Sequence, residues 1–262
     1  TFIHPFDDEN VIAGQGTIGL ELLDQLPDVE AVVVPVGGGG LISGVAYAVK
    51  SLNPNVKVYG VQASGAPSMV NSLHDHKQEK LAKVSTIADG IAVKEPGSVT
   101  FDICSRYVDD IVTVSEDEIC AAILHLIESE KMVAEGAGAA SVAAVMFNKV
   151  PVKGKKTICV VSGGNIDVTI LSRVINRGLA KSGRICTLII ELADKPGQLL
   201  KVCQVIAAQG GNIVSVYHER NNDSKKVTDC VLRLSVETKN QEHVESITKA
   251  LTDNGLKIRE NI

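Results

Sequence analysis

The sequence lacks long apolar runs and an excess of positive charge. No apolar run within its 262 residues approaches the length that spans a membrane. The net charge of −5 gives no support to nucleic-acid binding through a basic surface. We therefore expect a protein that binds neither a membrane nor a nucleic acid.

The common zinc motifs are also missing, since neither C-x-x-C nor H-E-x-x-H occurs. His74 and His76 lie in a polar stretch that is more typical of a solvated loop than of a metal site. The six cysteines are scattered, at positions 104, 120, 159, 186, 203 and 230. They lie mostly in apolar runs, which favours buried free thiols in a reducing compartment. We expect a cytoplasmic protein without a metal site.

The most informative stretch that is present runs from residue 31 to residue 50. Its valines predict a strand buried on both faces, as in a parallel sheet. The strand ends at Gly37, Gly38, Gly39 and Gly40, and apolar residues at helical spacing follow. Such a turn lets backbone N–H groups converge on an anion beside the positive end of a helix. We interpret it as a phosphate cradle; the alternative is a turn that only lets the helix pack closely on the sheet.

Two familiar phosphate motifs do not fit this turn. A dinucleotide fingerprint needs a glycine where Ile42 or Ser43 stands. A P-loop needs Lys and then Ser or Thr where Val45 and Ala46 stand. We therefore do not expect a nucleoside triphosphate, or a dinucleotide held in the usual way.

A second joint of the same kind occurs later in the chain. A strand over residues 56–62 completes a βαβ unit and predicts a parallel sheet. Residues 157–161 predict another buried strand, which runs into Ser162-Gly163-Gly164-Asn165 and then a helix. Because ligands of such sheets bind at the carboxyl ends of the strands, we expect both joints to face one cofactor.

Shorter elements lie between the two joints. Residues 64–73 are predicted to be helical, and the Ala-rich residues 136–147 are predicted to form a buried helix. Ser115 and Glu118 have the spacing of a capping box and predict that a helix begins there.

The pattern changes after Gly183. Strands are predicted over residues 186–192, 212–218, 227–236 and 256–258, and helices over 198–209 and 241–251, with a hairpin loop at Asn221-Asn222-Asp223. This βαββαβ order is typical of a ferredoxin-like unit. We predict two domains, 1–183 and 184–262.

Several motifs in one order resemble a known family. They are HPFDDENVIAGQGTIGLELL at 4–23, TIADGIAV at 86–93, EGAGAAS at 135–141 and both glycine joints. The chain resembles the pyridoxal-phosphate-dependent serine/threonine dehydratases, and within them the threonine ammonia-lyases that carry a C-terminal ACT domain. The ACT resemblance rests on D-K-P-G-Q-L at 194–199 and G-G-N-I at 210–213. It implies the large lobe of a fold type II (tryptophan-synthase-β-like) α/β enzyme followed by an α+β ACT domain.

The resemblance also implies a pyridoxal 5'-phosphate site. Gly37, Gly38, Gly39 and Gly40 would hold the phosphate, with Gly90 and Gly163 nearby. Ser162 matches the residue whose hydroxyl meets the pyridine nitrogen, a weak acid partner that makes the ring a tempered electron sink suited to elimination. Alternatively, Ser162 or Asn165 caps the next helix. Glu135 matches a glutamate near the cofactor and is a tentative catalytic residue; alternatively it complements a helix dipole.

The implied reaction converts L-threonine or L-serine to a 2-oxo acid and ammonia by β-elimination. It needs a lysine that forms a Schiff base with the cofactor, in a Ser-x-Lys-x-Arg-Gly type of motif. No such motif occurs here, and Lys50, Lys57 and Lys181 lie in other contexts. We therefore expect the chain to be a fragment or a product of processing that alone does not turn over threonine.

Serine racemase is the competing enzyme. The related racemases bind a divalent cation through acidic residues at positions that match Gln62 and Ser68. Because neither residue is a good ligand for a hard cation, we disfavour this alternative.

The ACT resemblance implies a different class of function, the binding of a regulatory amino acid. Asp194, Gly197, Asn212 and Ile213 would lie nearest this effector, in a homo-oligomer that is a dimer or a tetramer. The alternatives are a domain that serves only oligomerisation, and a chain that is a non-catalytic, amino-acid-binding regulatory fragment.

Overall fold

The computed structural model describes residues 3–220 and 229–259. The predicted hairpin loop at Asn221-Asn222-Asp223 lies outside the described residues. The chain forms two compact units, a first that extends to Gly178 and a second that starts at Leu179. None of the helices within the described ranges is both long and apolar enough to cross a bilayer.

The first unit contains a four-stranded parallel sheet in the order β3-β2-β1-β4. Its strands are β1 (Ala31–Pro35), β2 (Lys57–Ala63), β3 (Asp110–Val114) and β4 (Thr157–Cys159). Its helices are α1 (Glu9–Gln25), α2 (Gly40–Leu52), α3 (Ser68–His74), α4 (Ser98–Tyr107), α5 (Glu116–His125), α6 (Gly136–Met146) and α7 (Val168–Lys181), the last of which runs past Gly178. A 3-10 turn, η1 (Asp89–Ile91), and a π turn, η2 (Leu126–Glu130), complete the unit.

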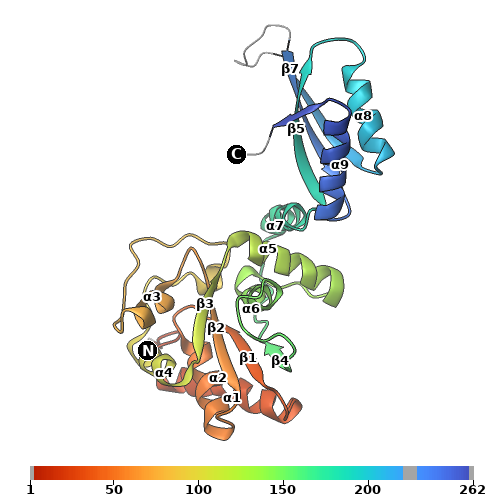
Figure 1. Ribbon diagram of the computed structural model, residues 1–262. Helices are drawn as coiled ribbons and strands as arrows, with labels where there is room; N and C mark the ends of the chain where they lie inside the picture. The colour runs from red at the N-terminus through yellow and green to blue at the C-terminus, as the bar shows by residue number, and fades with distance from the viewer. Residues whose placement is uncertain (1–2, 221–228, 260–262) are drawn as a thin grey trace. The chain divides into compact units, whose positions relative to one another are not determined.

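The sheet is covered on both faces, and this explains the continuous apolar run of β1. Val32 and Val34 are fully buried in a core that they share with α2. Ala31 and Val33 are equally buried in a second core, built largely from α5 and α6. Successive side chains of a strand point to opposite faces, so a strand between two helical layers has no polar face. Figure 1 shows this sheet and its helices in red to green.

The position of β1 decides where the site lies. β1 pairs in parallel with β2 on one side and with β4 on the other, where Ala31 lies opposite Thr157. The strand order therefore reverses at β1, and the segments that follow β1 and β4 leave the same edge of the sheet. This is the switch point at which doubly wound sheets bind ligands.

Two local predictions have different outcomes. The capping box is confirmed, because Ser115 Oγ accepts from the Glu118 N–H at 3.3 Å and Glu118 Oε2 accepts from the Ser115 N–H at 2.8 Å. The helix predicted over residues 64–73 begins only at Ser68. The Ser64 N–H is bonded to the Val114 carbonyl at 2.8 Å and so continues the sheet, and Pro67 then starts the helix.

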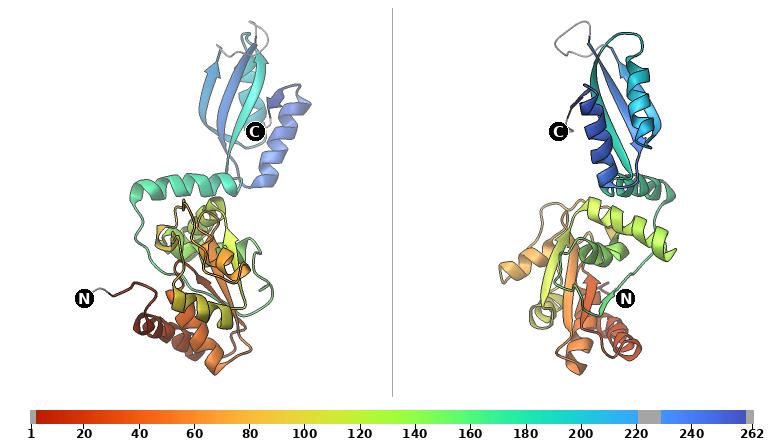
Figure 2. Two further views of the ribbon diagram at one scale, coloured as in Figure 1. Left: turned by 90° about the vertical axis from the view of Figure 1, so that its left-hand side faces the viewer. Right: turned by 45° about the vertical axis from the view of Figure 1, so that its right-hand side comes forward.

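The second unit is an antiparallel sheet in the order β6-β7-β5-β8. Its elements are β5 (Ile185–Ala193), α8 (Gln198–Ala208), β6 (Asn212–Glu219), β7 (Asp229–Glu237), α9 (Gln241–Asp253) and β8 (Lys257–Arg259). Alternate residues of β5 and β7 share one core with Val202 and Ile206 of α8 and Ile247 and Leu251 of α9. Both helices therefore cover one face of the sheet, in the predicted βαββαβ order (Figure 2).

Candidate functional site

A cavity of about 280 Å³ lies at the carboxyl edge of the parallel sheet. Its walls include both of the predicted joints, the glycine turn after β1 and Ser162 after β4. Most of the residues that the sequence predicts for the cofactor site line this cavity, namely Gly37, Gly38, Gly39, Gly40, Gly90, Glu135 and Ser162. The two joints therefore share one cleft, as predicted from the strand pattern.

The carbonyl groups of the glycine turn are held by the protein. The Gly37 carbonyl lies 3.5 Å from Gln62 Nε2, the Gly38 carbonyl accepts from Thr100 Oγ1 at 2.6 Å, and the Gly39 carbonyl accepts from the Ser43 N–H at 2.9 Å. In a trans peptide the C=O and the next N–H point in opposite directions. The N–H groups that follow these carbonyls therefore point away from their donors. Groups of this kind beside the N-terminus of α2 have the chemistry that binds an anion.

The absence of side chains in this turn also has a packing reason. A Cβ at Gly38 would lie 2.3 Å from the Phe6 ring, and a Cβ at Gly39 would lie 2.7 Å from Met69 Cε and 2.8 Å from Thr100 Cβ. Gly39 has a φ of 102°, which favours glycine in any surroundings. Close packing and the phosphate cradle are therefore compatible explanations of the same four glycines.

Phe6 is held against the turn by two aspartates, which the sequence analysis did not interpret. Asp8 accepts from two N–H groups at the start of α1. Asp7 accepts from the backbone N–H groups of Ser98, Val99 and Thr100 at the start of α4, at 2.9, 2.9 and 3.2 Å. Burial raises the pKa of Asp7, but these hydrogen bonds outweigh it and the pKa lies below its ordinary value. The adjacent aspartates thus anchor the segment to two different helices.

Glu135 lies between two glycines at the cavity wall. Its Oε1 would lie 3.1 Å from a Cβ at Gly90 and 2.4 Å from a Cβ at Gly163. Its N–H donates to the Gly163 carbonyl at 3.2 Å, whereas Gly163 itself is not among the residues that line the cavity. Within the described residues, the Glu135 side chain makes no capping hydrogen bond to α6, which begins at Gly136. The carboxylate is therefore directed at the two glycines.

Ser162 does not cap the following helix. α7 begins at Val168, and Asp167 Oδ1 accepts from the N–H groups of Thr169 and Ile170 at 2.7 and 3.3 Å. The capping alternative for Ser162 and Asn165 is therefore wrong, because Asp167 fills that role. Ser162 instead contributes to the cavity wall.

The positions that match the metal ligands of racemases are hydrogen-bonded inside the protein. Gln62 and Ser68 are both fully buried, and Gln62 Nε2 lies 3.5 Å from Ser68 Oγ. Gln62 Oε1 accepts from the N–H groups of Met69 and Val70, each at 2.9 Å. The amide oxygen of Gln62 is therefore occupied at the start of α3.

A second cavity of about 440 Å³ lies at the start of α8 in the second unit. Asp194 and Gly197 line it, together with His218, Arg220 and Cys230, which the sequence analysis missed. No local pattern marks these three residues, because they come from two other strand ends. Arg220 Nε lies 3.3 Å from Asp194 Oδ2.

The other two predicted effector residues lie elsewhere. Asn212 and Ile213 begin β6, whose far end carries His218. Asn212 Nδ2 donates to Glu237 Oε2 at 2.8 Å. The structure therefore brings Asp194 and Gly197 together in one cavity and places Asn212 and Ile213 at the opposite end of the strand.

The comparison with known families agrees with this geometry. Residues 1–164 match the pyridoxal-phosphate dependent enzymes, and residues 182–254 match the ACT domain. The chain belongs to the family of pyridoxal-phosphate dependent enzymes. The predicted fold, a fold type II large lobe followed by an ACT domain, is confirmed.

Named relatives of this family resemble the chain closely. It is 52% identical to an L-threonine ammonia-lyase of Thermotoga maritima over 258 residues, which are 98% of this chain and 64% of that protein. The processed form of threonine deaminase isoform 2 from Solanum lycopersicum is 42% identical, with a TM-score of 0.64 over 68% of this chain and 52% of that one. A serine racemase from Dictyostelium discoideum is 41% identical, with a TM-score of 0.59 over 63% of this chain and 54% of that one. The chain thus spans less than two thirds of the length of these relatives.

The residues of the first cavity fit the cofactor of this family. The glycine turn would hold the phosphate, because hydrogen bonds to a charged group contribute about 1.5–3 kcal/mol each. Ser162 would present its hydroxyl to the ring nitrogen, and the cavity of about 280 Å³ has these two groups in its wall. Glu135 would add a carboxylate beside them.

Proposed function

We propose that the whole protein is a threonine (or serine) ammonia-lyase that converts L-threonine to 2-oxobutanoate and ammonia. Its relatives with this name are 52% and 45% identical to the chain. The observation that carries the proposal is the single cavity that joins the glycine turn after β1 to Ser162 after β4. In this proposal residues 1–183 supply most of the cofactor site, and residues 184–262 form a regulatory domain.

Pyridoxal phosphate, when bound, supplies an electron sink for loss of the α-proton and of the β-hydroxyl group. The N–H groups of the glycine turn anchor the phosphate beside the positive end of α2. The Ser162 hydroxyl orients the ring nitrogen and, as a weak acid, does not keep it protonated. Glu135 can hold a proton at a carboxylate oxygen beside Gly90 and Gly163.

The activity test compares two polypeptides. The product of the whole gene is assayed with pyridoxal phosphate for 2-oxobutanoate release from L-threonine, with L-serine as the second substrate. We expect turnover of at least one of them. We expect no steady release from the 262-residue chain alone, because it contains no Ser-x-Lys-x-Arg-Gly motif. Steady release by that chain alone would contradict the assignment of the lysine.

The arrangement of Gln62 and Ser68 favours ammonia-lyase over serine racemase. Both side chains are neutral and engaged in internal hydrogen bonds. We therefore expect activity to persist when divalent cations are removed with a chelator. Loss of activity on chelation, together with formation of D-serine, would favour the racemase.

For the second unit, we propose binding of a regulatory amino acid at the cavity that contains Asp194 and Gly197. The Asp194 carboxylate suits an α-amino group, and the N-terminus of α8 with Arg220 suits an α-carboxylate. Isothermal titration of the chain with isoleucine, valine, threonine and serine tests this. A heat of binding with one of these amino acids supports regulation. The absence of a heat of binding with all four favours a domain that serves only oligomerisation, or a chain without an effector.

The oligomeric state and the cellular compartment of the protein are part of the same proposal. We propose a cytoplasmic homo-oligomer, a dimer or a tetramer, because residues 182–254 match the ACT domain, a type of domain that commonly pairs. Light scattering on the chain as it elutes from a size-exclusion column measures the mass of the assembly directly. A monomer at all concentrations would contradict this part of the proposal.

A further inference from the structure

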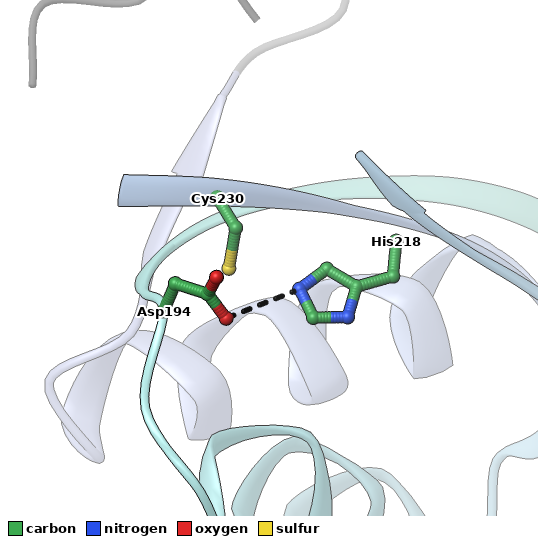
Figure 3. Close-up of side chains that lie close together, drawn as sticks. All are labelled: Asp194, His218 and Cys230. Carbon is green, nitrogen blue, oxygen red and sulfur yellow. Dashed lines mark ion pairs between the residues drawn. The ribbon is translucent and has the colours of Figure 1, made fainter. Parts of the chain in front are cut away.

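The cavity at the start of α8 gathers three side chains of the kinds that bind transition metals. Asp194 follows β5, His218 lies near the end of β6, and Cys230 lies near the start of β7. One ligand atom from each residue lies within 4.8 Å of the other two. Figure 3 shows the Cys230 sulfur and the His218 ring both directed toward the Asp194 carboxylate.

The sheet register brings two of these residues together, and the turn after β5 adds the third. Leu192 of β5 lies opposite Cys230, and His218 of β6 lies opposite Leu232. Cys230 and Leu232 are two residues apart, so Cys230 and His218 share a face of the sheet. Asp194 lies just beyond the end of β5, the strand that pairs with β7 at Cys230.

We propose that Asp194, His218 and Cys230 bind a thiophilic divalent cation of the Zn²⁺ type. Zinc takes thiolate, imidazole and carboxylate ligands at about 2.0–2.3 Å, so tetrahedral ligand atoms lie about 3.3–3.7 Å apart. His218 Nε2 lies 3.9 Å from Asp194 Oδ1, and all three ligand atoms lie within 4.8 Å of one another, so binding needs a contraction of up to about 1 Å between them. The thiol excludes magnesium and calcium, which prefer oxygen ligands.

The surroundings allow this binding. Cys230 is buried at 2% exposure, so the cation would sit on the floor of the cavity, with its fourth position open to water. The thiol proton leaves to solvent as the sulfur coordinates the cation. Arg220 competes for Asp194 at 3.3 Å, but its side chain is 67% exposed and can move into solvent.

The test uses the full chain with Co²⁺ as a spectroscopic probe and no amino acid present. We expect one Co²⁺ per chain, a thiolate-to-cobalt band in the near ultraviolet, and displacement of cobalt by Zn²⁺. Cys230→Ser should abolish the band. It should weaken Zn²⁺ binding at least about 10–100-fold, the range found even for partners that only orient a metal ligand. Cys203→Ser is the matched control, a cysteine of the same unit on α8, and should keep both the band and the affinity.

His218→Ala provides a second variant whose folding is not at risk, because the side chain is 33% exposed. It should lose Zn²⁺ affinity by a similar factor while the thermal transition of the metal-free chain stays unchanged. A wild-type chain without a stoichiometric cobalt band would overturn the proposal. So would a band that survives Cys230→Ser, or an unchanged Zn²⁺ affinity in His218→Ala. The cation and an effector amino acid would share Asp194, so the metal titration contains no amino acid and the amino-acid titration uses metal-free chain, which keeps the two outcomes distinguishable.

Discussion

Helices α2 and α8 begin in the same way in two different units. Gly39 precedes α2 with φ 102° and ψ −5°, and Gly197 precedes α8 with φ 89° and ψ −13°. A Cβ at Gly39 would meet Met69 at 2.7 Å and Thr100 at 2.8 Å, whereas a Cβ at Gly197 would meet nothing within 4 Å among the described residues. In the first unit, glycine is required by backbone and packing together. In the second, only the backbone requires it.

The two cavities also differ in the groups that would bind a ligand. The consecutive residues Gly37 to Gly40 contribute backbone groups to the first cavity. The cluster of Asp194, His218 and Cys230 in the second cavity instead joins side chains from separate strand ends, although the consecutive residues 192–199 also line that cavity. A site made of backbone tolerates few substitutions in its own segment, because the path of the chain is itself the binding surface. A site made of side chains depends on the register of the sheet.

Gly39→Ala should have the largest effect. The left-handed conformation costs a non-glycine residue about 1–2 kcal/mol, and overpacking costs about 1–3 kcal/mol more. We expect the free energy of unfolding of the first unit to fall by roughly 2–5 kcal/mol, with loss of pyridoxal phosphate binding. Urea unfolding followed by circular dichroism, and absorbance titration of the cofactor, measure both. Gly14→Ala is the control, because a Cβ there meets nothing within 4 Å in the described part of the chain.

Thr100→Val removes the hydroxyl that donates a hydrogen bond to the glycine turn after β1. Thr100 is fully buried, and its hydroxyl donates to the Gly38 carbonyl at 2.6 Å. Leaving that carbonyl without this partner should cost about 1–3 kcal/mol of unfolding free energy. Cofactor affinity should also fall, because the next N–H loses its orientation. Thr100→Ser keeps the hydroxyl and should lose less, and a loss in Thr100→Ser as large as that in Thr100→Val would contradict a dominant role of this hydrogen bond.

Gly197→Ala tests the difference between the starts of α2 and α8. Since only φ is unfavourable, the expected loss is about 1–2 kcal/mol, confined to the second unit. Gly197→Asn should lose less, because asparagine tolerates the left-handed region. Hydrogen exchange of α8 amides measures the local effect. A loss as large as that of Gly39→Ala would remove the distinction between the two helix starts.

Asp7→Asn should have the smallest effect, and the effect should depend on pH. The pKa of Asp7 lies below its ordinary value in the folded chain, because Thr100, Ser98 and Val99 donate to the carboxylate against the effect of burial. Its stabilisation is therefore present above the unfolded pKa of about 3.8 and is lost as the pH falls through the lower, folded value.

At neutral pH we expect a loss of about 0.5–2 kcal/mol, the usual contribution of a helix cap. The difference from wild type should shrink as the pH falls below about 3.8 and vanish below the lower, folded pKa. Unfolding at pH 7 and at successively lower pH measures it, with Asp24→Asn, an exposed aspartate of α1, as the control. A difference that persists in acid would assign the effect to packing instead of charge.

Local signals predicted most elements of the fold. The valine run predicted β1, and the spacing of Ser115 and Glu118 predicted the start of α5. The start of α3 was missed because Ser64 is bonded to β3, a contact between residues far apart in the chain. Phe6 was missed for the same reason, since its contact with Gly38 leaves no trace in either segment.

The sequence alone determined that a glycine turn joins a buried strand to a helix, because the residues that form this turn are neighbours in the chain. It could not determine the hydrogen bond from Thr100 to the Gly38 carbonyl or the cluster of Asp194, His218 and Cys230. Those depend on strand order and register, which are set by burial of two core faces over the whole sheet. Only the tertiary structure decided which distant side chains share a cavity.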